Sequence, residues 1–388
     1  MPRIRELDIF ESVLLPGPLN AITDVSGVAV GHYTLNQGTG ESLATAFDEG
    51  LATSFDEWQP GNGPFRTGVT VVLPHLGNLY EEKVPAAVHT INGFGKVAGF
   101  EQVRELGNIE TPIALTGTLN VPRVADALMT LAIEQSPHIG IGFAESGRQG
   151  WSSVNPVVGE TSDGYLSDIH ARPIGLAEVR AAVENASTGP VAEGAVGAGT
   201  GTSCYGWKGG IGTASRVLPA ERGGFTVGAL VQSNFGRPDE LTIAGVPIGR
   251  YLLPPVVPVR SPAGSIMMVL ATDAPLDARQ LGRLAHRAAF GLARTGSTVH
   301  GGSGDFVIAF STAYRILDRP DGLVTQRPAL AHEQLIIGAL GLAVIETVEE
   351  AVYNSLLMAR TIVGRDGNTR YALSAGEVQS VVRQHKMS

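Results

Sequence analysis

A glycine followed by a serine, Gly264-Ser265, opens an apolar run that ends at Leu270. A glycine-rich segment farther along the chain supplies a second hydroxyl, Ser303, and a carboxylate, Asp305. A serine at a newly cut N-terminus carries its own base, because its free α-amino group, with a pKa of about 8, lies beside the hydroxyl. A serine at the start of a buried strand more often serves packing, and one Gly-Ser pair is a weak signal. Our hypothesis is that the chain cuts itself before Ser265 and uses this residue as a hydrolytic nucleophile.

Another glycine-rich segment, Gly197-Ala198-Gly199-Thr200-Gly201, has the Gly-x-Gly spacing with which backbone amides approach a pyrophosphate. The third glycine of that motif would stand at position 202, where the chain has Thr202. Lys208 is followed by glycine rather than by serine or threonine, so the P-loop pattern is not met either. The segment therefore predicts close backbone packing near a site, and no nucleotide cofactor.

The nine histidines are scattered and form neither an HExxH motif nor another i, i+4 pair, so no metal site is expected. A Ser-His-Asp hydrolase needs a nucleophile elbow such as G-x-S-x-G. Around Ser303 only the inner glycines, Gly302 and Gly304, are present, and a strand rather than a helix is expected to follow. Both classes of site are disfavoured, and no cofactor is expected.

The composition is that of a folded protein with much buried surface. Of the 388 residues, 43% are hydrophobic and 17% charged, and 50 glycines without a collagen-like period indicate tight turns and close backbone approaches. The net charge of -9 argues against a nucleic-acid or anionic-membrane partner. The single cysteine, Cys204, excludes a disulfide framework and a CxxC redox motif.

The first eight residues lack the continuous apolar segment of a signal peptide. No run approaches the roughly 18 uninterrupted apolar residues that suggest a membrane span. The sequence therefore predicts a soluble, globular protein of the cytoplasm, without a nucleic-acid or membrane partner.

Helical and strand patterns alternate along the chain and predict a mixed α/β fold. Proline-rich residues 237–260 predict an irregular tether that leads to Ser265, because regular elements tolerate few prolines. Residues 193–213 are expected to form a glycine-dense loop, and the helix at 329–357 is expected to break at Gly338 and Gly341. The other expected elements are strands at 25–33, 68–74, 224–232, 266–271 and 306–311, and helices at 122–136, 176–185 and 277–296.

Taken together, many short segments resemble one family across nearly the whole chain, the L-aminopeptidase/D-esterase-amidase and β-peptidyl aminopeptidase family. Any one match is weak, but so many in the same order are specific. The matching segments are Asn20–Val25, Gly27–His32, Arg66–Thr70, Ile91–Gly95, Val158–Thr161, Asp163-Gly164, Gly197–Gly201, Lys208–Arg216, Gly264-Ser265 and Ser303–Asp305.

The resemblance implies a four-layer αββα sandwich, similar to N-terminal nucleophile hydrolases but with a different strand connectivity. It implies one domain spanning residues 1–388, cut by autoproteolysis into an α chain, 1–264, and a β chain, 265–388. The two chains would stay together, as a homotetramer of αβ units. The implied activity is that of a self-cleaving aminopeptidase, which hydrolyses peptides, amides or esters of α-L, D or β-amino acyl groups.

Residue by residue, Ser265 matches the family's nucleophile and Ser303 a second serine that hydrogen-bonds it. Asp305 matches a carboxylate that holds these hydroxyls in place; some members carry the longer Glu there, which leaves the geometry at Asp305 open. Asn234 matches an amide of the oxyanion hole, and Glu160 a carboxylate that receives the substrate's ammonium group. Taken singly, Asn234 also fits a turn, Glu160 a solvated loop and Asp305 a strand edge.

Two other functions stay open at this point. Ornithine acetyltransferases are similar self-cleaving proteins that transfer an acyl group, but their nucleophile is Thr where this chain has Ser265. An uncleaved protein that only binds a small molecule is the alternative outside enzymes. The preference among α-L, D and β-amino acyl groups is not determined by these residues.

Overall fold

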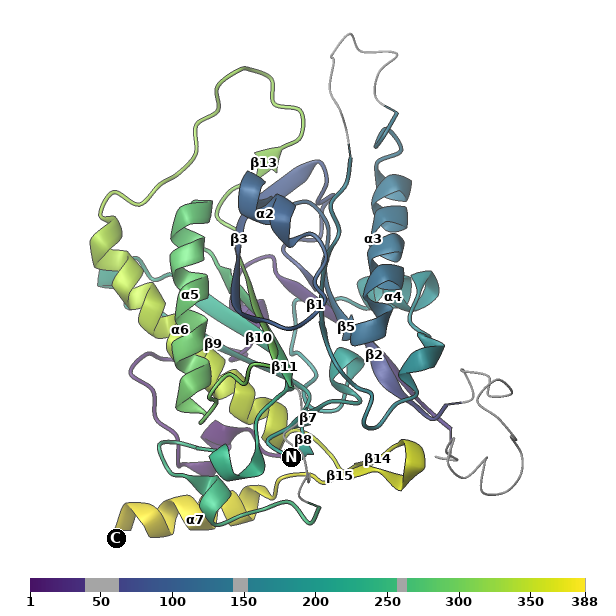
Figure 1. Cartoon of the computed structure of the whole chain (residues 1–388). Helices are drawn as coiled ribbons and strands as arrows, with labels where there is room; N and C mark the ends of the chain where they lie inside the picture. The colour runs from purple at the N-terminus through teal and green to yellow at the C-terminus, as the bar shows by residue number, and fades with distance from the viewer. Residues whose placement is uncertain (39–62, 142–152, 257–263, 388) are drawn as a thin grey trace, which may run out of the picture.

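Two β-sheets pack face to face and helices cover the outer face of each (Figure 1). The computed structural model describes residues 1–38, 63–141, 153–256 and 264–387. Apolar side chains fill three layers: one between the sheets and one beneath the helices on either side. This order of layers confirms the αββα arrangement and the mixed α/β class.

The smaller sheet has the strand order β1-β2-β5-β6. Its first three strands are antiparallel neighbours and β6 runs parallel to β5. Helices α3 and α4 cover its outer face, both ending within one residue of the expected positions. The bounds are Ala29–Gln37 for β1, Phe65–Leu73 for β2, Ile113–Gly117 for β5, Val157–Thr161 for β6, Val121–Gln135 for α3 and Leu176–Glu184 for α4.

The larger sheet has the order β13-β3-β12-β11-β10-β9, with β4 paired to β3. Strand β11 lies at its centre, parallel to β12 and antiparallel to β10. The bounds are Glu82–Gly93 for β3, Asn108–Ile109 for β4, Ile211–Val217 for β9, Thr226–Asn234 for β10, Ser265–Thr272 for β11, Gly304–Ser311 for β12 and Ile316–Leu317 for β13.

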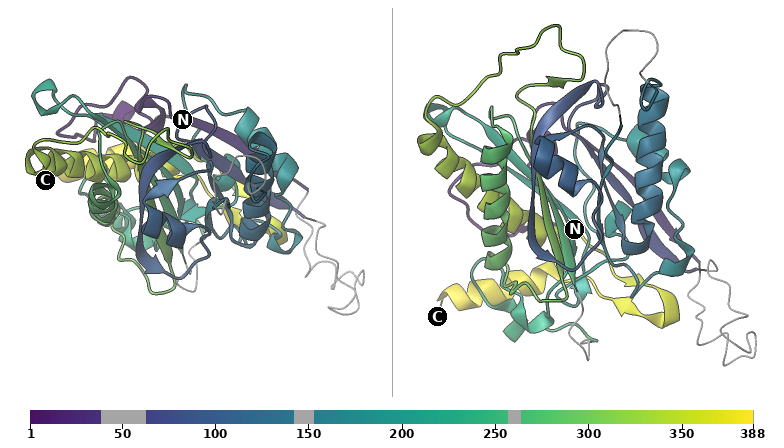
Figure 2. Two further views of the ribbon diagram at one scale, coloured as in Figure 1. Left: turned by 90° about the horizontal axis from the view of Figure 1, so that it is seen from above. Right: turned by 45° about the horizontal axis from the view of Figure 1, so that its top comes forward.

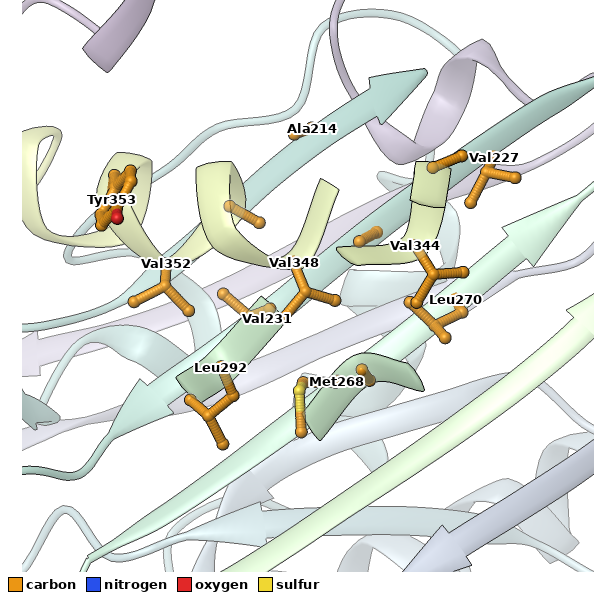
Figure 3. Packing of buried hydrophobic residues seen from close by; sticks show 14 of the residues in the cluster. Ala214, Val227, Val231, Met268, Leu270, Leu292, Val344, Val348, Val352 and Tyr353 are labelled. Carbon is orange, nitrogen blue, oxygen red and sulfur yellow. The ribbon is translucent and has the colours of Figure 1, made fainter. Parts of the chain in front are cut away.

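Helices α5 (Ala278–Arg294) and α6 (Glu333–Leu357) cover the outer face of this sheet. Val348 and Val352 of α6 pack on Val231 of β10, beside Leu292 of α5 (Figure 3). Asp277 caps α5, since its carboxylate accepts the Gln280 N–H at 2.7 Å. Helix α5 therefore starts where the sequence predicts it and buries the predicted apolar face.

The expected break in α6 at Gly338 and Gly341 is wrong, because the helix is continuous through both glycines. Gly341 faces α5: a Cβ there would meet the side chain of Arg287, which would have to move. The lost helical propensity of about 1 kcal/mol for a glycine is offset by burial of the flanking apolar residues.

Small elements lie at the end of the sheets where β11 begins (Figures 1 and 2). They include the hairpin of β7 (Ser203–Cys204) and β8 (Trp207–Lys208), and the pair β14 (Ile362–Val363) and β15 (Thr369–Arg370). Helix α7 (Ala375–Met387) also runs there, whereas α2 (Phe100–Leu106) lies beside β3. In the described residues, no helix is both long and apolar enough to cross a bilayer.

The expected loop at residues 193–213 is only partly a loop, because β7, β8 and the start of β9 lie within it. Its expected close packing is confirmed: a Cβ on Gly201 would collide with the carbonyl oxygen of Arg66. The expected tether is irregular up to residue 256, with two single 3-10 turns at Pro238–Glu240 and Ile248–Arg250. Its residues 257–260 lie outside the described chain.

Candidate active site

Ser265 is the first residue of the central strand β11, and its neighbours on both sides are sequence-predicted site segments. It pairs with Asn234 on β10 and with Gly304 on β12. Strand pairing therefore places beside Ser265 two residues that are 31 and 39 positions away from it in the sequence. Ser265 is only 6% exposed.

The carbonyl group of Gly264 is held directly against the Ser265 hydroxyl. Ser265 Oγ donates a hydrogen bond of 2.7 Å to the Gly264 carbonyl oxygen, which also accepts the Gly304 N–H at 3.0 Å. The Gly304 N–H lies 3.3 Å from Ser265 Oγ as well. A side chain at Gly264 would not fit, because its Cβ would lie 2.8 Å from the Cα of Phe235.

Ser303 and Asp305 lie next to this pair and bond to each other. Ser303 Oγ donates to Asp305 Oδ1 at 2.7 Å, and both residues are buried. The expected bond between the Ser303 and Ser265 hydroxyls is not among those of the described residues. In the joined chain the Ser265 proton is engaged by the Gly264 carbonyl, so that bond stays a prediction for the cut form.

Asp305 is a buried carboxyl with one unused oxygen: Oδ2 has no hydrogen-bond partner among the described residues. Burial raises the pKa of Asp305 to about 6, although the Ser303 hydroxyl and the nearby backbone N–H of Ile266 oppose this shift. The shorter Asp in place of Glu therefore still reaches Ser303, but its negative charge is poorly compensated.

We expect Asp305→Asn to become more stable relative to wild type as the pH rises. At pH 3 the carboxyl is protonated in the folded and unfolded chains, so it causes no difference. Between pH 4 and 6 the Asp305 carboxyl ionises in the unfolded chain but not in the folded one, and this lowers the stability of the wild-type fold. Above about pH 6 it is ionised in both, and the loss of stability no longer changes with pH. The shift of the Asp305 pKa from 3.8 to about 6 limits the stability difference between the two proteins to about 3 kcal/mol.

Melting curves of both proteins between pH 3 and 8 measure this difference. Asn keeps an oxygen to accept the Ser303 hydroxyl, so the comparison isolates the charge. A stability difference that does not change between pH 4 and 6 would show that Asp305 ionises like an exposed carboxyl.

Asn234 ends β10 with its amide fixed in one orientation. Asn234 Oδ1 accepts the backbone N–H of Ser203 at 2.9 Å. Because the oxygen is engaged, the Nδ2 group is left to donate, and it has no protein partner among the described residues. Since Asn234 is paired with Ser265 in the sheet, this donor is available beside the hydroxyl.

Glu160 comes from the other sheet, near the end of β6, and is buried. Its Oε1 accepts the backbone N–H of Lys96 at 2.8 Å. Burial raises the pKa of Glu160, while the Lys96 N–H, the Lys96 charge and the Thr118 hydroxyl oppose the shift. The carboxylate is therefore a buried acceptor that a cation would stabilise.

Two glycines separate Glu160 from Ser265. A Cβ on Gly95 would lie 3.1 Å from Glu160 Oε1 and 3.3 Å from the Cα of Gly304. A Cβ on Gly304 would lie 3.1 Å from Ser265 Oγ. The absence of side chains at these positions lets the carboxylate and the hydroxyl approach from opposite sheets.

Three donors of this site belong to the backbone and could not be identified from the sequence: the N–H groups of Gly304, Lys96 and Ser203. Asn92 is a further residue that was not predicted: its amide donates to the carbonyl groups of Ser303, His300 and Gly301 and so shapes the turn before β12. Asn92 lies within a matched segment, and an Asn beside a glycine was the available signal.

A group of possible metal ligands lies elsewhere, where Glu81, His138 and Asp318 bring ligand atoms within 4.8 Å of one another. The ammonium of Lys83 lies 2.6 Å from Asp318 Oδ1 and already compensates that carboxylate. The group is separate from Ser265 and adds nothing to its chemistry.

Known proteins resemble this chain over most of its length. The family model of peptidase family S58 matches residues 20–370. The β-peptidyl aminopeptidase BapA of Sphingosinicella xenopeptidilytica is 38% identical, over 98% of this chain and 91% of its own length.

Two solved structures share the fold over almost the whole chain. The PH0078 protein of Pyrococcus horikoshii OT3 is 45% identical with a TM-score of 0.87, and 99% of each chain is covered. The L-aminopeptidase D-Ala-esterase/amidase of Ochrobactrum anthropi, described as a variant of the Ntn hydrolase fold, is 36% identical with a TM-score of 0.83, over 100% of this chain and 99% of its own. The chain belongs to peptidase family S58.

Proposed function

We propose that the chain cuts itself between Gly264 and Ser265 and then acts as an aminopeptidase with Ser265 as its nucleophile. The observation that carries the proposal is the contact of the Ser265 hydroxyl with the Gly264 carbonyl group, 2.7 Å between the oxygens, with the Gly304 N–H on the same carbonyl oxygen. This arrangement has the hydroxyl and an oxyanion donor on one peptide bond.

In the cutting step, Ser265 Oγ would attack the carbonyl carbon of Gly264. The developing oxyanion would be stabilised by the Gly304 N–H, which already contacts that oxygen. The C–N bond then breaks, the nitrogen takes up the hydroxyl proton and an ester joins Gly264 to Ser265 Oγ. Water hydrolyses this ester, which releases the Gly264 carboxylate and leaves Ser265 with a free α-amino group.

In turnover, the same hydroxyl would attack the carbonyl carbon of a bound substrate. The new α-amine and the pair Ser303–Asp305 would receive and return its proton. The free Nδ2 group of Asn234 would donate to the oxyanion, together with a backbone N–H. The leaving amine or alcohol departs with a proton, and water then hydrolyses the acyl-enzyme.

Glu160 would select substrates with a free amino group. Its buried carboxylate accepts one backbone N–H and is separated from Ser265 by the glycines 95 and 304. An ammonium group that pairs with it would be held firmly, since charge-assisted bonds are strong where water is excluded. The substrates would be small peptides, amides or esters of an N-terminal amino acyl group, of the α-L, D or β class.

Two further expectations belong to the same proposal. Assembly into a tetramer of αβ units is expected from the resemblance, and exposed apolar side chains such as Val13 at 79% and Leu15 at 77% exposed are available for subunit contacts. The location in the cytoplasm stays a prediction from the sequence.

The proposal predicts two chains in the purified wild-type protein. Mass spectrometry under denaturing conditions should give the masses of residues 1–264 and 265–388, and Edman sequencing of the shorter should begin Ser-Ile-Met-Met-Val. At least one of the p-nitroanilides of L-alanine, D-alanine and β-alanine should be hydrolysed, while its N-acetylated form should be a poor substrate. One intact chain without hydrolysis would favour a binding protein, and transfer of the acyl group to an amine instead of water would favour an acyltransferase.

A further inference from the structure

Lys208, the last residue of β8, is a fully buried lysine that the proposed mechanism does not use. Its ammonium group donates to three backbone carbonyl oxygens: Gly199 at 2.8 Å, Thr202 at 2.9 Å and Gly209 at 2.6 Å. In the parts of the chain that the structure describes, no carboxylate lies within ion-pair distance of it. The three N–H donors of the charged Lys208 side chain are thus all hydrogen-bonded, but only to neutral groups.

Burial of a charge without a countercharge is unfavourable, so Lys208 weakens the fold unless its contacts compensate. Burial lowers the pKa of Lys208 to about 7. A methionine or leucine would fill the same volume without this cost. What the ammonium supplies beyond volume is therefore its charge and its three donors.

One of its contacts leads directly to Asn234. The oxygen that accepts from Lys208 Nζ and the N–H that donates to Asn234 Oδ1 belong to the same peptide group, between Thr202 and Ser203. A cation on the oxygen of a peptide group draws electron density from its nitrogen, because the two atoms are conjugated. The Ser203 N–H thereby becomes a stronger donor to Asn234.

The same effect continues through the side-chain amide. Asn234 Oδ1 accepts the Ser203 N–H at 2.9 Å. The Nδ2 group of Asn234 is conjugated to this oxygen, just as the nitrogen of a peptide group is conjugated to the oxygen of that group. Hydrogen bonds in such a chain strengthen one another, and more so in a buried setting. The fixed orientation also keeps Nδ2, rather than the oxygen, beside Ser265.

We propose that Lys208 is a positioning residue of the oxyanion hole, which acts through the Thr202–Ser203 peptide group to orient and polarise the Asn234 amide. This inference rests on the proposed role of Asn234. Lys208 touches neither Ser265 nor the substrate, so its contribution should be made in the transition state, where charge develops on the oxyanion, and not in substrate binding.

The test is a double-mutant cycle on the full chain with β-alanine p-nitroanilide. Lys208→Met should lower kcat by about tenfold or more and leave KM within about twofold. In the Asn234→Ala background the same change should lower kcat less than about threefold, because the amide through which Lys208 acts is gone. Turnover is normalised to the processed β chain seen on a denaturing gel.

Lys83→Met is the matched control. Lys83 is a largely buried lysine on β3 that pairs with Asp318 and Glu110, away from Ser265. Lys208→Gln is the second variant, since it keeps two N–H donors but no charge and is expected to fold where Met does not. Lys83→Met should leave kcat unchanged, and Lys208→Gln should lose kcat as Lys208→Met does.

The outcomes separate the two levels of the proposal. If Asn234→Ala keeps the wild-type kcat, the proposed oxyanion hole is wrong, whatever Lys208 does. If Asn234→Ala loses kcat but the Lys208 variants lose equally in both backgrounds, Lys208 acts independently of Asn234 and this inference is overturned. A wild-type kcat in folded Lys208→Gln would overturn it as well.

Discussion

Ser265→Ala is expected to remain one uncut chain of 388 residues and to have no measurable aminopeptidase activity. The hydroxyl that contacts the Gly264 carbonyl would be missing, so neither the cutting step nor the acyl-enzyme could form. Loss of a serine nucleophile costs a factor of about 10⁶ in kcat in a well-studied serine hydrolase. Denaturing gels and a p-nitroanilide assay measure both effects.

Two further variants separate chemistry from packing at this position. Ser187→Ala, the same change at an exposed serine, should give two chains and wild-type activity. Ser265→Cys retains a nucleophile of similar size and should cut at least partly. Two chains from Ser265→Ala, divided at the same bond, would show that another group attacks Gly264.

Glu160→Gln is expected to cut normally but to lose activity on substrates with a free amine. The cutting step involves no free amine, whereas turnover would lose the partner of a desolvated ammonium group, at a cost of about 2–5 kcal/mol. That corresponds to roughly 30-fold to several-thousand-fold in kcat/KM. Gln keeps the oxygen that accepts the Lys96 N–H, so the backbone there should be undisturbed.

The comparison of free and N-acetylated substrates tests the assignment. N-acetylated substrates should be poor with wild type and little changed by Glu160→Gln. Glu110→Gln is the control, because Glu110 is also a buried carboxyl whose pKa is raised by burial, but it pairs with Lys83. Equal hydrolysis of both substrate types by wild type would mean that Glu160 does not select an amine, and that the protein is a broader amidase.

The pH dependence should show the same carboxyl. Burial raises the pKa of Glu160, so the carboxylate is lost at a higher pH than for an exposed Glu. As the pH falls, KM for free-amine substrates should therefore begin to rise at a higher pH than it would if Glu160 had the pKa of an exposed glutamate.

Much of the local structure could be predicted from the sequence, because it depends on neighbours along the chain. The period of apolar residues placed α3 and α4 within one residue, and Asp277 marked the start of α5. Local rules failed at Gly341, where the sequence predicts a break but the helix continues and packs against α5. They failed also at residues 193–213, where the glycine-dense sequence predicts a loop but the short hairpin of β7 and β8 and the start of β9 are formed.

The candidate site, too, could be predicted from the sequence only in part. The sequence identified the residues whose side chains have distinctive chemistry, Ser265, Ser303, Asp305, Asn234 and Glu160, by their order along the chain and a resemblance. Their roles remain proposals, but the tertiary structure brings all five to one end of the two facing sheets. It alone added the backbone donors, since every residue except proline has an N–H and only strand register decides which of them face a reacting carbonyl.

Buried charges show the difference most clearly. A polar face on a predicted helix or loop ordinarily lies in water, so nothing in the sequence separates Lys208 or Glu350 from an exposed residue. In the structure both are fully buried, Lys208 on three carbonyl groups and Glu350 on the guanidinium of Arg216 at 2.7 Å. The sequence determined which groups are present and where helices and strands begin, because those depend on short-range sterics and periodicity. Only the tertiary structure decided which charges lose their water and which partners replace it, because those partners come from distant parts of the chain.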